Sequence, residues 1–402
     1  MSLNKDQKIL IVTNHFFPEN FKVNEIAYTL RDYASVTVVT SRPNYPTGRF
    51  FQGYNKLFTN EENLKIFRLP VFPRKNGKMI FILLNYFSYW ISLSLFFTAL
   101  IIGNQRFNHI LIHHTSPPLI SIPPILYKVL YPKTKMIFWE LDVWPESLTS
   151  VTPLNIKSFL YKFIEKGMNY VYSFYSIVLI GSKSYETILK DRAKKSRIEY
   201  FPNWAENIYE NFENSIEINL PKGLNIIYAG NIGTVQNLEI IPELINSTEN
   251  VNFIILGDGK YSKPLQRICK SRGILDRVLF LGYKPLDEVA CYIDKSDIAF
   301  LSLKSSPIFD KTVPAKLMAY MAMGKPILGV ISGEGKSLIN TSKCGIAISP
   351  GKVTEIIKAI DKLRSLKECD LKQLGENGRQ YYNSTFRFEA RIEQLLKLIK
   401  DP

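Results

Sequence analysis

The chain contains few of the residues that make disulfide bonds or soft-metal centres. Its 402 residues include only four cysteines and four histidines. None of the cysteines, at positions 269, 291, 344 and 369, stands at a Cys-x-x-Cys spacing. We therefore expect reduced thiols, either buried or at the surface, and neither a disulfide framework nor a cysteine-ligated metal.

The chain also starts without the pattern of a secretory signal. Residues 1–18, MSLNKDQKILIVTNHFFP, enter a strand-like apolar run and lack the charged, apolar and small-residue sections in succession. Together with the cysteine usage, this predicts a cytoplasmic protein.

Acidic side chains are fewer than basic ones, which gives a net charge of +15. The excess lies in residues 1–200, with 25 basic and 13 acidic side chains, whereas residues 201–402 carry 26 and 23. The first half also holds two dense aromatic clusters, within residues 81–97 and 159–175. Basic residues among aromatic ones suit a lipid headgroup layer. A nucleic-acid partner is not favoured, because no groove-reading or single-strand-binding module is recognisable.

Short β-branched runs alternate with longer helical patterns along the whole chain, and this alternation predicts an α/β protein with parallel sheets. Twelve strands are too many for one doubly wound sheet of ordinary size, so we expect two Rossmann-like domains. The predicted domains are residues 1–203 and residues 204–385, with a terminal helix in 386–402 packing back on the first domain. The predicted strands are 9–13, 36–40, 66–68, 110–113, 136–140, 177–180, 224–229, 251–256, 278–281, 298–301, 326–329 and 345–348.

One segment competes with this plan. Residues 79–105 contain no charge, and the run over 79–102 is long enough to span a bilayer. A span would place the strands before and after it on opposite sides of a membrane and would divide their shared sheet. We therefore favour a helix that is partly core and partly membrane-facing, flanked by Arg74, Lys75 and Lys78. A wholly buried helix is the second reading, and a true span the third.

Ligands of parallel sheets bind beyond the carboxyl ends of strands, so polar residues at strand exits are candidates. His15, His113 and His114 stand at such exits, and their rings could hold protons or hydroxyl groups near neutral pH. Asp142 follows another strand and could orient a hydroxyl. A structural role is the alternative for each histidine, and metal binding is the weaker option.

Two segments of the second half combine glycine or a helix start with polar groups. Gly230 and Gly233 follow a strand and open a helix, which would let backbone approach a phosphate closely. Pro314 marks a helix start at which the N–H groups of residues 315–317 and the Lys316 ammonium form a plausible diphosphate seat. The alternative is a plain amphipathic helix with a solvated lysine.

These segments together resemble the retaining nucleotide-sugar glycosyltransferases of family 4, particularly the bacterial O-antigen, capsule and colanic-acid branch that includes N-acetylfucosaminyl-type enzymes. The similarity runs over nearly the whole chain. It is carried by the segments HFFPE (15–19), TSPPL (115–119), LDVWPES (141–147), FPNWAEN (201–207), YAGNIGTVQNLE (228–239), ILGDGK (255–260), FLGYKP (280–285) and VPAKLMAYMAMGKPIL (313–328). The resemblance implies the GT-B fold, in which two Rossmann-like domains face each other.

By position, the resemblance also implies roles for individual residues. His15, His113 and Asp142 would face the sugar and the acceptor, and Lys316 would stabilise the leaving diphosphate. The other donor-binding positions are Gly230, Asn231, Gly233, Gln236, Gly257, Gly259, Tyr283, Lys284, Pro314, Ala315, Leu317 and Glu334.

The chain departs from the family pattern at two places. The cationic clamp of the family falls on Asn231 and Gln236, and its paired glutamates fall on Lys311 and Ala319. Glu334 is the expected substitute for the missing ribose-binding carboxylate.

The function implied by the resemblance is retaining transfer of a hexose or N-acetylated deoxyhexose, with uridine as the expected base. The acceptor would be a lipid-linked saccharide at the inner face of the cytoplasmic membrane, in cell-surface polysaccharide synthesis. We expect no cofactor and no metal, because no Asp-x-Asp motif stands in a fitting place. A nucleotide-sugar epimerase on the same fold and a non-catalytic scaffold of a polysaccharide assembly complex remain alternatives.

Overall fold

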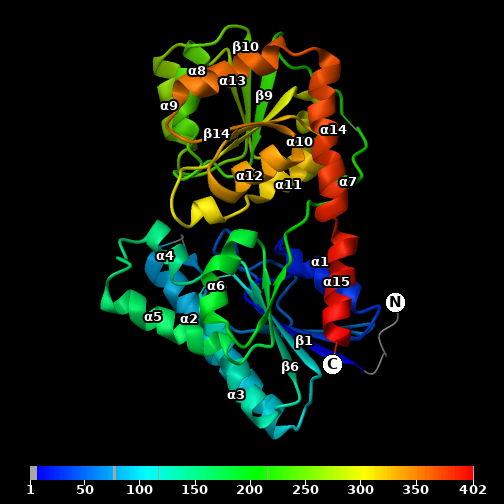
Figure 1. Cartoon of the computed structure of the whole chain (residues 1–402). Helices are drawn as coiled ribbons and strands as arrows, with labels where there is room; N and C mark the ends of the chain where they lie inside the picture. Colours follow the sequence, from blue (N-terminus) through cyan, green and yellow to red (C-terminus); the bar gives the residue numbers. More distant parts are fainter. Residues whose placement is uncertain (1–6, 76–77, 116, 215, 402) are drawn as a thin grey trace. The chain divides into compact units, whose positions relative to one another are not determined.

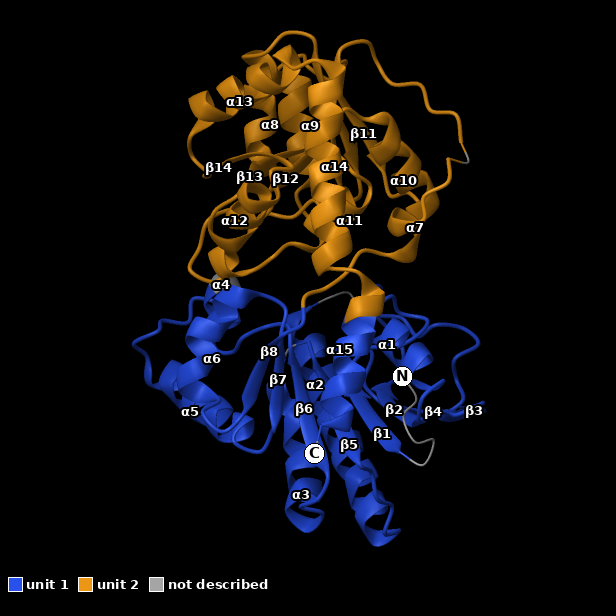
Figure 2. Ribbon diagram, turned by 45° about the vertical axis from the view of Figure 1, so that its right-hand side comes forward, with its two compact units in different colours: residues 1–201, 391–402 blue, residues 202–390 orange. Residues whose placement is uncertain are grey.

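The computed structural model describes residues 7–75, 78–115, 117–214 and 216–401. The chain divides into two compact units, which are coloured separately in Figure 2. Unit 1 comprises Met1–Phe201 together with Arg391–Pro402, and unit 2 comprises Pro202–Ala390. Each unit has one β-sheet with helices on both sides (Figure 1), so the α/β prediction with two parallel sheets is confirmed.

The sheet of unit 1 has eight strands in the order β3-β4-β2-β1-β5-β6-β7-β8. All neighbours are parallel except β3, which pairs antiparallel with β4. The strands are β1 (Lys8–Thr13), β2 (Ser35–Ser41), β3 (Phe58–Glu61), β4 (Leu64–Leu69), β5 (His109–His114), β6 (Lys135–Glu140), β7 (Ile177–Ile180) and β8 (Arg197–Tyr200). The strand order reverses between β1 and β5, which makes the carboxyl ends of these two strands the expected ligand edge.

Helices of unit 1 cover both faces of this sheet. They are α1 (Lys22–Leu30), α2 (Met79–Ile102), α3 (Ile122–Leu130), α4 (Glu146–Val151), α5 (Phe159–Tyr172) and α6 (Glu186–Arg192). The last helix of the chain, α15 (Phe388–Lys400), hydrogen-bonds to β8 through Gln394, whose Nε2 donates to the Tyr200 carbonyl at 3.0 Å. Leu395 and Ile399 of α15 are buried.

Helix α2 is the one described helix that is long and apolar enough to cross a membrane by length and composition. It packs on the sheet through a stripe repeating every four residues, namely Asn85, Tyr89, Leu93 and Phe97. The Tyr89 hydroxyl donates to the Thr13 carbonyl of β1 at 2.7 Å. The helix is therefore a layer of unit 1, with one narrow face buried and the remainder outward.

The outward sides of α2 and α3 form what we call the apolar face. Phe97 of α2 and Tyr127 of α3 contact each other edge to face, with ring centroids 5.8 Å apart, so the two helices lie side by side. The exposed apolar side chains of the face are Met79, Ile80, Leu83, Leu84, Phe87, Ile91, Leu95, Ile102, Ile122, Leu126, Val129 and Leu130. A surface of this extent is unusual for a protein domain that meets only water.

The sheet of unit 2 has six parallel strands in the order β11-β10-β9-β12-β13-β14. The strands are β9 (Leu224–Ala229), β10 (Val251–Leu256), β11 (Val278–Gly282), β12 (Ile298–Ser302), β13 (Ile327–Val330) and β14 (Gly345–Ile348). This is the order of a dinucleotide-binding fold, with the reversal between β9 and β12.

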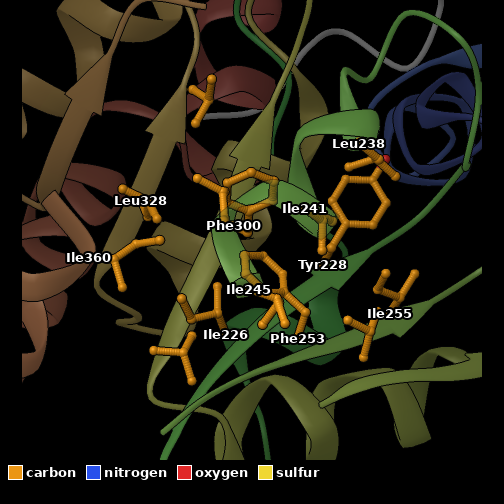
Figure 3. Packing of buried hydrophobic residues seen from close by; sticks show 14 of the residues in the cluster. Ile226, Tyr228, Leu238, Ile241, Ile245, Phe253, Ile255, Phe300, Leu328 and Ile360 are labelled. Carbon is orange, nitrogen blue, oxygen red and sulfur yellow. The ribbon is translucent and has the colours of Figure 1, made fainter. Parts of the chain in front are cut away.

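The core of unit 2 lies against this sheet. Figure 3 shows part of it, in which Ile226, Phe253 and Phe300 from three strands meet Ile245 and Ile360 from two helices. The helices are α7 (Asn207–Glu210), α8 (Ile241–Asn246), α9 (Ser262–Ser271), α10 (Leu286–Lys295), α11 (Ala315–Ala322), α12 (Gly333–Ser342), α13 (Val353–Ser365) and α14 (Glu368–Thr385). Buried strand side chains on this scale give the unit a core of its own.

The four cysteines are free, with Cys269, Cys291 and Cys344 buried and Cys369 exposed. Burial raises the pKa of the Cys269 and Cys344 thiols to about 11. The two buried groups therefore stay protonated at neutral pH.

Candidate active site

Two loops at the carboxyl edge of the sheet in unit 2 interlock through glycines. Gly230 follows β9, and Gly257 and Gly259 follow β10; all three have positive φ angles. A Cβ on Gly257 would lie 2.0 Å from the Gly230 carbonyl oxygen, and one on Gly259 would lie 2.4 Å from that of Ile232. The backbone of one loop therefore occupies the space of the other loop's missing side chains, which fixes both in one conformation.

Gly230 also makes room for Lys316, the residue that the sequence singles out in α11. A Cβ at position 230 would lie 2.3 Å from the Cε atom of Lys316. The ammonium group rests over the ring of Tyr228, 4.8 Å from the centroid. Gly230 and the Lys316 side chain are therefore in direct contact.

The Lys316 side chain is half-buried, and none of the ion pairs found in the described chain involves it. Desolvation lowers the pKa of Lys316 to about 8, and no carboxylate counteracts this shift. A desolvated cation without a protein counter-ion, at the N-terminal turn of an eight-residue helix, is suited to an anionic ligand.

The α11 start meets a second helix start. Pro314 is the N-cap of α11, and a Cβ on Gly335 in the first turn of α12 would lie 3.6 Å from its Cδ atom. Glu334, the expected ribose contact, is buried in that same first turn of α12. Ala319, which replaces the carboxylate of the family pattern, is buried inside α11.

The other predicted donor positions surround these loops at different depths. Gln236 has a buried Oε1 atom without a hydrogen-bond partner among the described residues, 2.5 Å from where a Cβ on Gly233 would lie. Asn231 reaches the Gly259 backbone, because a Cβ on Gly259 would lie 2.7 Å from the Oδ1 atom of Asn231. Ala315 is exposed and Leu317 is buried in α11.

Tyr283 and Lys284 lie farther out, just after the edge strand β11. The Tyr283 side chain is 83% exposed. Lys284 forms a partly exposed ion pair with Glu288, with 2.8 Å between Nζ and Oε2. The structure therefore places Tyr283 at the surface and Lys284 in a local ion pair.

In unit 1, His15 lies at the exit of β1 with both ring nitrogens engaged. Its Nδ1 atom is 2.6 Å from the Glu19 carboxylate, and its Nε2 atom is 3.2 Å from Nη2 of Arg74. Arginine can only donate, so Nε2 accepts and Nδ1 carries the proton. Burial lowers the pKa of His15, which agrees with a neutral ring. This geometry makes His15 a positioning residue that holds Arg74 and Glu19 together.

His113, at the exit of β5, has a hydrogen bond at one ring nitrogen, Nδ1, within the described residues. Thr13 donates its hydroxyl proton to the His15 carbonyl at 2.9 Å, and its Oγ1 atom lies 2.9 Å from Nδ1 of His113. The threonine proton is already used, so His113 must donate from Nδ1, and Nε2 carries the lone pair. Burial lowers the pKa of His113 to about 3. The ring is thus a neutral acceptor across the physiological range.

The His113→Ala change is expected to lower acceptor turnover, measured as kcat/KM for the acceptor, about tenfold through the loss of one hydrogen bond. Donor affinity should change less, because the diphosphate contacts assigned to Gly230 and Lys316 are made within unit 2. Thr13→Val, which removes the group that fixes the tautomer, should give a smaller loss. Unchanged turnover in His113→Ala would contradict this role.

Asp142 follows β6 and is exposed, whereas its neighbour Glu140 is fully buried. Burial, assisted by the Asp142 carboxylate, raises the pKa of Tyr86 against the opposing effect of Arg74, so Asp142 lies near this tyrosine. Glu140 accepts from the Asp142 amide at 3.1 Å and pairs with His114 at 2.7 Å. Glu140 is therefore a buried anchor, and Asp142 is the exposed carboxylate of the two.

His114, the third histidine at a strand exit, lies within the packing of unit 1. It is fully buried, and its Nε2 atom has no hydrogen-bond partner within the described chain. Its ring lies 5.0 Å from that of Phe138. The structure gives His114 a place in the packing beneath the site, in line with the structural alternative.

Sequence reasoning missed the residues that complete the His15 cluster. Arg74 donates from Nε to Asn85 of α2 at 3.1 Å and stacks on Tyr86, 4.7 Å from the ring centroid. Glu19 also accepts from the backbone amides of Asn44 and Tyr45 at 2.6 Å. Arg74 is 59 positions from His15, and no local pattern links them.

Within the residues that the structure describes, no group of three or more His, Cys, Asp or Glu side chains is placed to hold a metal ion. Lys316 places a cation beside Gly230 at the glycine loops.

Comparison with known proteins decides the class of activity. Residues 211–381 match the family model described as Glycosyl transferases group 1. The chain is 26% identical over 323 residues to the probable glycosyltransferase WbjE of Pseudomonas aeruginosa, which covers 75% of this chain and 78% of that protein. The chain is a glycosyltransferase.

Two further similarities concern fold and relatives. The structure of Anabaena Alr3699/HepE in complex with UDP aligns with a TM-score of 0.68 at 14% identity, over 98% of this chain and 99% of that one. The putative colanic acid biosynthesis glycosyltransferase WcaL of Salmonella typhimurium is 22% identical over 149 residues, 37% of each protein. The enzyme has the GT-B fold, and the matched group 1 segment contains Gly230, Gly257 and Lys316.

Proposed function

We propose that this enzyme transfers a hexose or an N-acetylated deoxyhexose from a nucleotide diphosphate sugar to a hydroxyl group, with retention at the anomeric carbon. The observation that carries the proposal is the desolvated Lys316 ammonium, held over Tyr228 beside Gly230 without a carboxylate partner. A diphosphate would supply the missing negative charge.

The chemistry follows from where charge develops. The bond between the anomeric carbon and the diphosphate oxygen breaks while the acceptor oxygen bonds to the same face of that carbon. The leaving diphosphate gains negative charge, which Lys316 and the N–H groups of the α11 start stabilise. The acceptor proton passes to the departing phosphate oxygen. Asp142 or His113, through its free Nε2 lone pair, orients the acceptor hydroxyl.

Uridine is the base we propose for the donor. The support is the fold similarity to HepE, whose structure contains UDP, together with the family resemblance of the sequence. Glu334 is the proposed ribose contact. Because Lys316 supplies the positive charge that a divalent ion would otherwise supply, we also propose that the reaction needs no metal. Activity should therefore be the same after a chelator removes metal ions.

We further propose a lipid-linked saccharide as the acceptor, in the assembly of a cell-surface polysaccharide at the inner face of the cytoplasmic membrane. The similarity to WcaL supports the pathway class. The exposed apolar face of α2 and α3 supports contact with lipid. Exposed Phe159 and Phe163 with Lys162 on α5 add the aromatic and basic composition of an interfacial helix.

The test is thermal unfolding of the purified protein with UDP, GDP, ADP and their sugars, first without metal and then with Mg²⁺. We expect UDP and UDP-sugars to raise the Tm, and Lys316→Ala to abolish the shift. Lys358→Gln, a charge change on an exposed residue of α13, serves as the matched control. The absence of a shift with every nucleotide would overturn the proposal and favour the scaffold alternative.

The affinity for UDP should depend on pH through Lys316. The free amine has a pKa of about 8, and the diphosphate favours its charged form. Well below pH 8, Lys316 is already charged and UDP binding needs no proton uptake. Above pH 8, binding is accompanied by uptake of one proton by Lys316. We expect the Kd for UDP to rise up to about tenfold per pH unit above pH 8, measured by calorimetry in two buffers of different ionisation enthalpy. In Lys316→Gln this proton uptake should vanish.

A further inference from the structure

A basic pocket lies at the amino edge of the sheet in unit 1, the edge opposite to His15 and His113. Its volume is about 490 Å³, and its lining includes Lys8 at the start of β1, Arg106 before β5 and Lys133 before β6. Cavities of this size accept small organic ligands. Parallel strands place their first residues at one edge, which explains why residues so far apart in sequence line one pocket.

The cations of this pocket are not neutralised by the described chain. Arg106 donates from Nε to the Asn104 side-chain amide at 3.2 Å, and its guanidinium lies over the Tyr131 ring, 5.7 Å from the centroid. No ion pair of the described residues includes Arg106, Lys8 or Lys133. Nearby Lys128 differs, because its Nζ donates to the carbonyls of Pro132 and Thr134 at 2.7 Å.

The pocket is continuous with the apolar face. Leu130 lines the pocket and also belongs to the outward stripe of α3. The ends of α2 and α3 are joined here, since the Tyr131 hydroxyl donates to the Ile101 carbonyl at 3.4 Å and that of Tyr127 donates to the Gln105 carbonyl at 2.8 Å. Ile102, at the end of α2, is 81% exposed. A ligand with an anionic head and an apolar tail would meet both surfaces.

We propose that this pocket binds the phosphate headgroup of an anionic phospholipid, with the acyl chains lying along α3 and α2. Lys8, Arg106 and Lys133 provide the positive charge, and Arg106 offers the planar donor geometry that suits phosphate. The site is separate from the catalytic one: α2 has 24 residues and spans about 36 Å from the carboxyl edge to the amino edge. This inference rests on the proposed contact with a membrane.

The headgroup site gives the membrane contact a direction. The apolar face alone would bind any bilayer, whereas a cationic pocket at one end of it selects anionic lipids. With the lipid bound at the end of α2, the whole helix lies along the bilayer surface. The other end of α2, where Asn85 holds Arg74, then stays close to the membrane as well.

The experiment is flotation of the full chain with vesicles of phosphatidylcholine alone or with about 30 mol% phosphatidylglycerol. We expect the wild-type protein to prefer the anionic vesicles, and Arg106→Gln/Lys133→Gln to lose roughly tenfold or more of that binding. Lys358→Gln/Lys362→Gln, the same charge change on α13 of unit 2, should bind as the wild type does.

Three outcomes overturn the inference: equal binding of the wild type to both vesicles, unchanged binding of the Arg106 and Lys133 variant, or equal loss in the α13 control. A soluble probe separates lipid from free phosphate. Dihexanoyl phosphatidylglycerol should protect Lys133 from amine labelling, and equal protection by glycerol phosphate would overturn the assignment to lipid. The UDP-dependent Tm shift should be the same in all these variants, so failure here is distinguishable from failure of the proposed transferase.

Discussion

Lys316→Gln is expected to lower kcat/KM for the donor about 10²- to 10³-fold, the usual loss when one preorganised charge stabiliser is removed from a developing anion. The reason lies in the local geometry. The ammonium is held over Tyr228 by the space that Gly230 leaves, so it is already oriented before the ligand arrives. Steady-state kinetics with a UDP-sugar, compared with Lys358→Gln, measures the effect.

The same change is expected to stabilise the protein without ligand. The pKa of Lys316 is about 8 in the folded protein, below its ordinary value of 10.5. The unfolded chain therefore binds the proton more tightly, so the penalty is fully present below pH 8 and disappears as the pH rises toward 10.5. At pH 7 we expect Lys316→Gln to gain about 1 kcal/mol, a value discounted for the half-exposed side chain.

Activity loss combined with higher stability would distinguish a functional lysine from a structural one. A Tm that falls in Lys316→Gln would show that the side chain holds the loops together instead. A small loss of kcat/KM would show that the backbone N–H groups of α11 carry the diphosphate alone.

Gly257→Ala is expected to destabilise unit 2 by about 3 kcal/mol or more, because nothing near the new methyl group can yield. Its Cβ would lie 2.0 Å from the Gly230 carbonyl oxygen, which is backbone, and the residue has a φ angle of +120°. Hydrogen exchange of peptides that contain β9 and β10 would report the loss within unit 2 alone.

Gly351→Ala is the matched control. Gly351 also has a positive φ angle, of +86°, but nothing lies within 4 Å of its missing Cβ. It should cost only the conformational penalty, about 1 kcal/mol. Equal losses in the two variants would show that the interlocked loops contribute nothing beyond backbone strain.

The sequence predicted the strands with long apolar runs well. All twelve predicted strands are present. The two that were not predicted are β3 and β8, which have four residues each and lie at the edges of their sheet. Edge strands have one unpaired side and short, mixed sequences such as Phe-Thr-Asn-Glu, so their pairing with a neighbour defines them more than any pattern does.

The site residues also separate into those that local sequence marks and those that only the fold brings together. Lys316 and Gly230 were predicted because each stands at a strand exit or a helix start, which local residues mark. The Glu19–His15–Arg74 cluster was not, because Arg74 comes from a loop far along the chain. The role of His113 changed in detail: only the hydrogen bonds of Thr13 show which ring nitrogen is free.

The buried stripe of α2 sets a limit for making this enzyme easier to purify. Asn85 and Tyr89 hydrogen-bond to Arg74 and to the end of β1. Deletion of α2 would therefore remove contacts that hold the Glu19–His15–Arg74 cluster, together with the apolar face. Polar substitutions confined to outward positions such as Leu83, Phe87 and Leu95 leave those supports in place. Redesign of the apolar face is therefore compatible with intact donor chemistry, whereas truncation of α2 is not.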